Sequence, residues 1–186
     1  MPLALDAATA LVLIDLQHGT TSAELAPHPL ADVVARAAQL LAAFRAKGRP
    51  VVIVSVNPAG SDQSRIRTQA PGLPAQLPPN FVELLPEIRV AMGEVRIHKQ
   101  TWNAFYRTPL HDELERLGIT GIVLAGVSTS IGVEGTARAA AERGYNIAFA
   151  TDAMTDRVAD AHERSLQHIF PRLGQLATTE EILALV

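Results

Sequence analysis

The sequence predicts an α/β fold in which helices cover both faces of a mainly parallel sheet. Short apolar runs alternate along the chain with segments of helical periodicity, the order typical of strand–helix–strand units with right-handed crossovers. The apolar runs are continuous rather than alternating, which indicates strands that are buried on both faces. The 186 residues are 48% hydrophobic and contain no internal repeat or linker, so we expect one domain over residues 1–186.

Six strands are expected, five from clear apolar runs and a sixth from a weaker pattern near the C-terminus. Glycine or proline stands before some of these runs, as Pro50 does before the second and Gly144 before the fifth, and marks where they begin. In chain order the predicted strands cover residues 10–14, 51–56, 94–98, 121–125, 146–150 and 176–177.

Helices are expected between the strands and after the last one. The clearest covers residues 30–47, in which Val33, Ala37 and Leu40 recur at helical spacing, and Gly48 is a typical C-terminal stop. The other predicted helices cover residues 109–117, 133–143, 160–169 and 179–186. Residues 57–86 are rich in Pro, Gly, Ser and Gln, and an irregular segment of that length is typical of a functional loop or lid.

Composition excludes several classes of protein. A net charge of −3 without a basic block gives no reason to expect nucleic acid or a membrane surface as a partner. The absence of cysteine excludes disulfides, thiolate metal sites and thiol catalysis. The histidines lack metal-ligand spacing and no nucleotide-binding glycine motif is present, so we expect neither a metal nor a cofactor. Because there is no signal-peptide pattern and no apolar run near about 20 residues, a cytoplasmic protein is expected.

Polar residues follow most of the predicted strands. Ligands of parallel sheets bind beyond the carboxyl ends of the strands, so these residues are the candidates for a site. They are Asp15, Asn57, His98, Lys99, residues 128–130 and Asp152. Their convergence predicts a binding site at this edge of the sheet.

Asp15 and Lys99 are charged residues at the ends of two predicted strands. A buried carboxylate without a partner is costly, and a lysine at the same edge of the sheet can neutralise it. In the alternative interpretations, Asp15 caps backbone amides and Lys99 is a solvated surface residue. The lysine would lower the pKa of Asp15 and burial would raise it, so the residue is either a general acid or a base that activates water.

Residues 126–134, with the sequence GVSTSIGVE, open the helix that follows the fourth strand. Ser128, Thr129 and Ser130 are ordinary helix-capping residues, although a helix N-terminus also presents free amides to an anion. Gly132 permits close approach of a ligand or a neighbouring segment. A hydroxyl nucleophile in this turn is a further alternative, which would require a base such as His18, His98 or Asp15.

From its first strand to about Asp156 the chain resembles the isochorismatase-like (cysteine hydrolase) superfamily. The resemblance rests on the order and spacing of short motifs: LIDLQ at 13–17, Lys99 with AF at 104–105 and TPL at 108–110, GVxT at 126–129, VExTA at 133–137, GYN at 144–146, and DA at 152–153. It implies a Rossmann-like αβα sandwich, a homo-oligomer (dimer or tetramer), and a non-proline cis peptide near residues 127–128. It also implies catalytic residues at Asp15, Lys99 and Gly132.

Gly132 occupies the place where the cysteine hydrolases of this superfamily carry their nucleophile. Without sulfur no thioester intermediate can form, so the amidase mechanism does not carry over. Isochorismatases are similar in having glycine here, and they hydrolyse a vinyl ether without covalent catalysis. The resemblance therefore implies that Asp15 protonates the enol-ether carbon, while Lys99 orients Asp15 or holds a substrate carboxylate. The chain departs from isochorismatases in the turn before Gly132, and from nicotinamidases in having Asn57-Pro58-Ala59 where their Asp-x-His metal motif stands.

The sequence thus predicts a cysteine-independent hydrolase that acts on a small anionic metabolite. The amides around Ile131 and Gly132 are expected to form an anion pocket. The predicted substrate-binding residues are Gln17, Trp102, Phe105, Ser128, Thr129, Ser130 and Ile131. The alternative is a binding or regulatory protein on a degenerate enzyme scaffold, which would bind a ligand without converting it.

Overall fold

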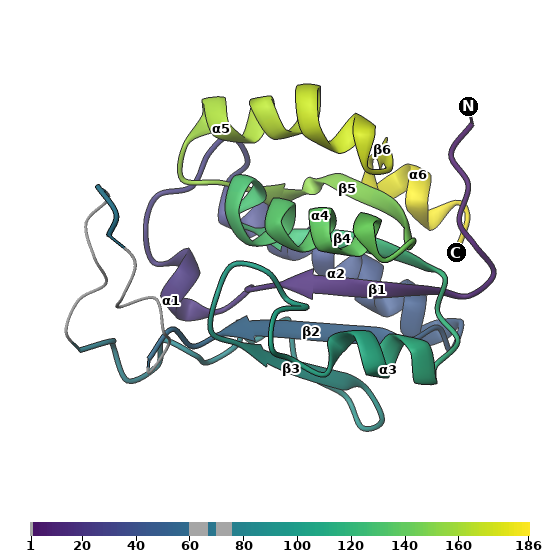
Figure 1. Ribbon diagram of the computed structural model, residues 1–186, viewed down its shortest axis with the longest axis horizontal. Helices are drawn as coiled ribbons and strands as arrows, with labels where there is room; N and C mark the ends of the chain where they lie inside the picture. The colour runs from purple at the N-terminus through teal and green to yellow at the C-terminus, as the bar shows by residue number, and fades with distance from the viewer. Residues whose placement is uncertain (1, 60–66, 70–75) are drawn as a thin grey trace.

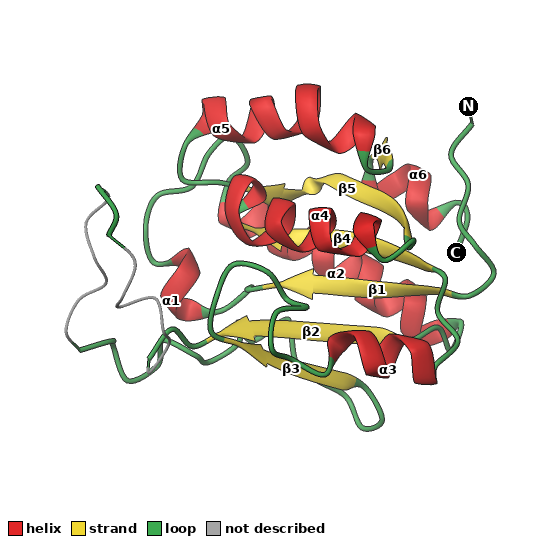
Figure 2. Cartoon of the chain, in the orientation of Figure 1, coloured by secondary structure: helices red, strands yellow, loops and turns green. Residues whose placement is uncertain are grey.

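The computed structural model describes residues 2–59, 67–69 and 76–186. It contains a six-stranded sheet in the order β3-β2-β1-β4-β5-β6, in which every neighbouring pair is parallel. Helices lie on both faces, as Figures 1 and 2 show: α3 and α4 lie in front of the sheet and α2 behind it. The predicted fold class, a Rossmann-like αβα sandwich, is therefore confirmed.

The strands and helices fall close to the predicted segments. The strands are β1 Thr9–Ile14, β2 Val51–Val56, β3 Val95–Lys99, β4 Gly121–Val127, β5 Asn146–Thr155 and β6 Gln175–Ala177. The α-helices are α1 His18–Thr21, α2 Leu30–Ala46, α3 Leu110–Arg116, α4 Glu134–Glu142, α5 Ala159–Arg164 and α6 Thr179–Leu183. Shorter helical turns are η2 Thr129–Val133, η3 Ser165–Ile169 and η4 Phe170–Arg172. The short helix α1 was not expected from the sequence.

The continuous apolar runs are explained by two hydrophobic cores, one on each face of the sheet. Along β1, Ala10, Val12 and Ile14 belong to the core that contacts α3 and α4, whereas Leu11 and Leu13 belong to the core that contacts α2. All six residues of β1 are buried, because side chains alternate between faces that are both covered. Among the described residues, no helix is long and apolar enough to cross a membrane.

The strand order places a topological switch point between β1 and β4. The chain leaves β1 toward β2 and β3 on one side, and it returns to β4, β5 and β6 on the other. Such a switch leaves a crevice at the carboxyl ends of the two central strands. Gly126 lets β4 lie close to β1 at this end: its φ is 121°, and a Cβ atom there would lie 2.1 Å from the carbonyl oxygen of Ile14.

β5 is five residues longer than predicted, so the residues at its carboxyl end are not those expected from the sequence. The pairing of β4 with β5 is irregular between Leu124 and Gly126, and β5 then continues to Thr155. Asp152 therefore lies within the strand rather than after it. Its carboxylate forms an ion pair with Arg36 (3.1 Å) and accepts the backbone N–H of Thr179 (2.7 Å). The expectation that Asp152 belongs to the site was therefore wrong.

Part of the predicted loop or lid, residues 57–86, lies outside the described residues. Within the described part, Gln17 bonds to the backbone of Phe81 and Leu84 pairs with Gln17 in an isolated bridge. The segment around Phe81 is thereby held against the residues that follow β1.

Candidate active site

The three predicted catalytic residues meet in one cavity at the carboxyl ends of the central strands. Asp15 follows β1, Lys99 ends β3, and Gly132 lies in η2 after β4. All three line a cavity of about 280 Å³. The lining also includes Val56, Pro58, Phe81, Thr101, Trp102, Ser128, Ile131 and Arg157. In Figure 1 these strand ends point to the edge of the sheet beside α1.

Asp15 and Lys99 form a buried ion pair. The Nζ atom of Lys99 lies 2.5 Å from Oδ2 of Asp15, and it also donates to the carbonyl oxygen of Thr101 at 3.0 Å. Asp15 is 4% exposed and Lys99 is 2% exposed. The interpretation of Lys99 as a surface residue is therefore wrong, and Asp15 bonds an ammonium group rather than capping a helix.

The second carboxylate oxygen of Asp15 is free. Oδ1 is buried and has no hydrogen-bond partner within the described residues. Burial raises the pKa of Asp15 to about 6, although the charge of Lys99 and its hydrogen bond both lower it. A carboxyl group with that pKa is protonated in roughly one molecule in ten at pH 7, which suits a general acid.

Gly132 leaves open the space beside this carboxyl group. A Cβ atom at position 132 would lie 3.2 Å from Oδ2 of Asp15, 3.1 Å from Cγ2 of Ile14 and 3.3 Å from the carbonyl oxygen of Val127. A Cβ atom here would thus be in close contact with Asp15, Ile14 and Val127. With glycine, that space is open to a substrate atom or to water.

The turn that carries Gly132 begins with a non-proline cis peptide between Val127 and Ser128, as predicted. Ser128 and Ile131 line the cavity, but Thr129 and Ser130 do not. The hydroxyl group of Thr129 is buried against Nδ1 of His162 at 2.8 Å, and the backbone N–H of Ser130 donates to Asp156 at 2.7 Å. Of the three predicted polar residues, only Ser128 is placed to contact a substrate.

The backbone amides of the turn are largely used within it. The N–H of Ile131 donates to the carbonyl oxygen of Ser128 at 3.1 Å, and the N–H of Val133 donates to the same oxygen at 3.2 Å. The amide of Ile131 is therefore not free to bind an anion. The predicted anion pocket therefore loses the amide of Ile131, and the cationic side chains that line the cavity are further candidates for binding an anion.

Gln17 and Phe105 lie outside the cavity lining. The side chain of Gln17 accepts the N–H of Val56 (2.7 Å) and donates to the carbonyl oxygens of Val56 (2.9 Å) and Phe81 (2.8 Å). Phe105 is buried in the core and stacks on Tyr145 with 5.9 Å between ring centroids. Neither geometry supports the predicted contact with substrate; Gln17 instead holds two cavity-lining segments together. Trp102 does line the cavity and is 60% exposed.

Two functional candidates at the end of β5 were not found from the sequence. Arg157 has an exposed side chain that lines the cavity, and Asp156 is buried beneath it. The carboxylate of Asp156 accepts the backbone N–H groups of Ser130 and Arg157, each at 2.7 Å. The signal was the polar triplet Thr155-Asp156-Arg157, which marks the true end of the strand.

Histidine side chains near this edge of the sheet bond other protein side chains. Among the described residues, no group of three His, Cys, Asp or Glu side chains is arranged to hold a metal ion. His98, a predicted base for a hydroxyl nucleophile, bonds Ser55 at 2.9 Å. His162 is 1% exposed, and its Nδ1 atom lies 2.8 Å from the hydroxyl oxygen of Thr129.

A buried acid and lysine beside a small cavity, at the switch point of a parallel sheet, define the chain as an α/β enzyme. It belongs to the isochorismatase family, because residues 9–181 match the isochorismatase domain. The members of this family are hydrolases, and the chain is accordingly a hydrolase.

Several relatives match this chain over nearly its whole length. The uncharacterized isochorismatase family protein YecD of Escherichia coli O157:H7 is 41% identical over 177 residues, which cover 94% of each chain. The maleamate amidohydrolase of Pseudomonas putida is 30% identical over 180 residues, covering 94% of this chain and 84% of that protein. An isochorismatase family protein of Burkholderia thailandensis has a similar structure, with a TM-score of 0.91, 40% identity and coverage of 97% of this chain and 96% of that one.

Proposed function

We propose that this hydrolase works without a cysteine nucleophile and cleaves a vinyl ether of the isochorismate type in a small anionic metabolite. Asp15 is the general acid and Lys99 its electrostatic partner. The observation that carries the proposal is the state of the Asp15 carboxyl group. It is buried, its pKa is raised to about 6, its Oδ1 atom has no partner within the described residues, and Gly132 leaves the adjacent space open.

The proposed reaction begins with proton transfer from Asp15 to the terminal carbon of the enol ether. The resulting oxocarbenium ion takes up a water molecule at the ether-bearing carbon, and the Asp15 carboxylate accepts a proton from that water. The hemiketal then collapses to a ketone and an alcohol, so that the net change is addition of one water. Lys99 stabilises the Asp15 carboxylate formed in the first step, because its Nζ atom already lies 2.5 Å from Oδ2.

Lys99 also has a donor left for the substrate. Two of the three N–H groups of a lysine are accounted for by Asp15 and by the carbonyl oxygen of Thr101. The third can bond the ether oxygen or a carboxylate in the cavity. Trp102, Ser128 and Ile131 line the space that the rest of the substrate would occupy.

The test is product formation from isochorismate by the purified protein, followed as released pyruvate. Asp15→Asn keeps the shape of the side chain but cannot supply the proton, so turnover should fall by at least about 100-fold. Asp160→Asn makes the same chemical change at an exposed position of α5 and should leave turnover intact. Equal turnover in Asp15→Asn and the unchanged protein would exclude Asp15 as the acid. Saturable binding without product would favour the alternative of a ligand-binding protein.

The homo-oligomer and the cytoplasmic location remain predictions from the sequence and its resemblance. Light scattering coupled to size-exclusion chromatography tests the first of these.

A further inference from the structure

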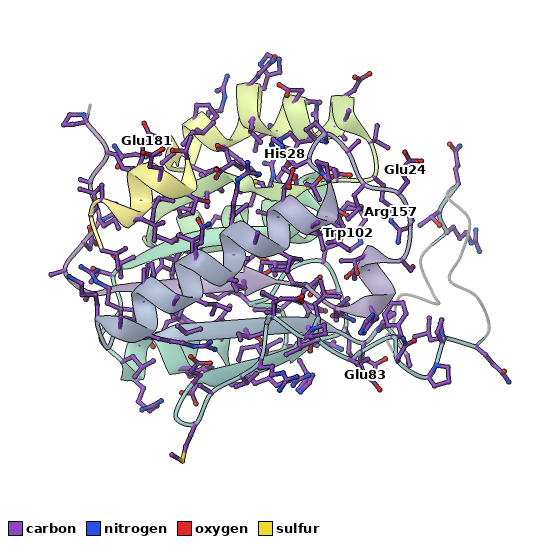
Figure 3. All side chains as sticks on the ribbon, turned by 180° about the vertical axis from the view of Figure 1, so that it is seen from behind. Glu24, His28, Glu83, Trp102, Arg157 and Glu181 are labelled. Atoms are coloured by element: carbon purple, nitrogen blue, oxygen red, sulfur yellow. The ribbon has the colours of Figure 1, made fainter. Side chains whose placement is uncertain are left out.

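Arg157 is the charged residue of the cavity that the proposed mechanism leaves unused. Its side chain is exposed and lines the same cavity as Asp15, Lys99 and Trp102. Figure 3 shows Arg157 and Trp102 side by side at this end of the molecule. Within the described part of the chain, the guanidinium group of Arg157 has no hydrogen bond or ion pair. Its donors are therefore available to a ligand.

The backbone of Arg157 is fixed relative to the turn that carries Gly132. Asp156 accepts the N–H of Arg157 through Oδ1 and the N–H of Ser130 through Oδ2, each at 2.7 Å. Asp156 is 2% exposed, so these bonds are shielded from water. The end of β5 and the start of η2 are thereby held together, and the base of the Arg157 side chain is held near the cavity.

The charges that face the cavity favour an anionic ligand. Lys99 and Arg157 contribute two positive charges, against the single carboxylate of Asp15. Two of the three N–H groups of Lys99 bond Asp15 and the carbonyl oxygen of Thr101, which leaves one for a ligand. The amide of Ile131 is bonded within the turn. Arg157 thus offers more donors to a ligand than Lys99 does, and a guanidinium group presents paired N–H donors that match a carboxylate.

We infer that Arg157 binds the substrate carboxylate and selects carboxylate-bearing substrates. This inference rests on the proposed function and gives the substrate an orientation. The carboxylate lies at the mouth of the cavity against Arg157, the uncharged body lies against Val56, Phe81 and Ile131, and the reacting bond lies next to Asp15. Because Arg157 does not touch the reacting bond, it determines affinity for substrate rather than the rate of the chemical step.

The experiment compares the binding of benzoate and benzamide, two probes of the same size that differ in a carboxylate. Isothermal titration calorimetry on the whole protein at low ionic strength should show benzoate binding about tenfold more tightly than benzamide. Arg157→Gln should remove this preference. The matched control is Arg164→Gln, which removes the same charge from an exposed position of α5 and should retain the preference.

Two outcomes would overturn the inference. Equal binding of the two probes by the unchanged protein would mean that the cavity does not select carboxylates. A preference that persists in Arg157→Gln would assign carboxylate recognition to another group, Lys99 first of all.

A kinetic measurement separates this inference from the proposed function. With isochorismate as substrate, Arg157→Gln should raise KM about tenfold and leave kcat within about twofold, whereas Asp15→Asn should lower kcat. A loss of kcat in Arg157→Gln without a change in KM would refute the binding role and leave the role of Asp15 intact. Unchanged turnover in Asp15→Asn would refute the proposed mechanism, while the probe preference would still report on Arg157.

Discussion

The pH dependence of stability distinguishes a general acid at Asp15 from a carboxylate in a conventional salt bridge. Burial raises the pKa of Asp15 from 3.8 to about 6 in the folded protein, with Lys99 opposing the shift. The folded state therefore binds the proton more tightly than the unfolded state. The stability that this proton confers is fully present below pH 3.8 and is lost as the pH rises through about 6.

The size of the effect follows from the two pKa values. The pKa of Asp15 differs by about 2.2 between the unfolded and the folded protein. This difference corresponds to about 3 kcal/mol of unfolding free energy over the full titration, because a pKa difference of one is about 1.4 kcal/mol. Denaturation is practical between about pH 4.5 and about pH 8. Over this interval, the linkage relation predicts that the contribution of Asp15 to the free energy of unfolding changes by about 2 kcal/mol. The free energy of unfolding contributed by Asp15 should fall by that amount as the pH rises.

The assay is urea denaturation followed by circular dichroism at several pH values in this interval. The reference is the double variant Asp15→Asn/Lys99→Met, which removes both partners and leaves no unpaired buried charge. The difference in free energy of unfolding between the unchanged protein and this reference should decrease with pH. A difference that increases with pH would show a lowered pKa at Asp15 and would refute its role as general acid. A constant difference would show that burial and the lysine cancel.

Two further predictions concern neighbours of Asp15. Lys99→Met removes the two interactions that lower the pKa of Asp15, so the pKa should rise above about 6 and the alkaline limb of the kcat profile should move to higher pH; an unmoved limb would mean that another group sets it. Gly132→Ala places a Cβ atom 3.2 Å from Oδ2 of Asp15, so turnover should fall at least about tenfold while the free energy of unfolding drops by only about 1–2 kcal/mol. Full turnover in Gly132→Ala would show that the substrate does not enter this space.

The fold was accessible from the sequence because its signals are local. Runs such as Val51–Val56 are long enough to form a strand and apolar enough to be buried on both faces. The end of β5 was missed, because Thr151 and Asp152 interrupt the apolar run although the strand continues past them. Its continuation depends on pairing with β4, and such pairing between distant segments leaves no local pattern in the sequence.

Local patterns also identified part of the site, whereas the residues whose positions depend on distant segments were missed. Asp15 and Lys99 were found because a charged residue at the end of a buried strand lies at the edge of the sheet. Arg157 was missed together with the end of β5. Gln17, which ends the LIDLQ motif, was predicted to bind the substrate, yet its side chain bonds the backbone of Phe81, 64 residues away. Proximity in sequence identifies the edge of the sheet but does not say which way each side chain points.

Gly132 and Asp15 are best understood together. The Cβ atom of a side chain at position 132 would lie 3.2 Å from Oδ2 of Asp15, so a thiol at this position would be near enough to exchange a proton with that carboxyl group. This chain has no cysteine, and among the described residues the side-chain carboxyl group of Asp15 bonds Lys99 alone. In the proposed mechanism, Asp15 exchanges its proton with the substrate and with water rather than with a neighbouring thiol. That mechanism needs no nucleophile at position 132, so glycine at this position is compatible with hydrolysis on this scaffold.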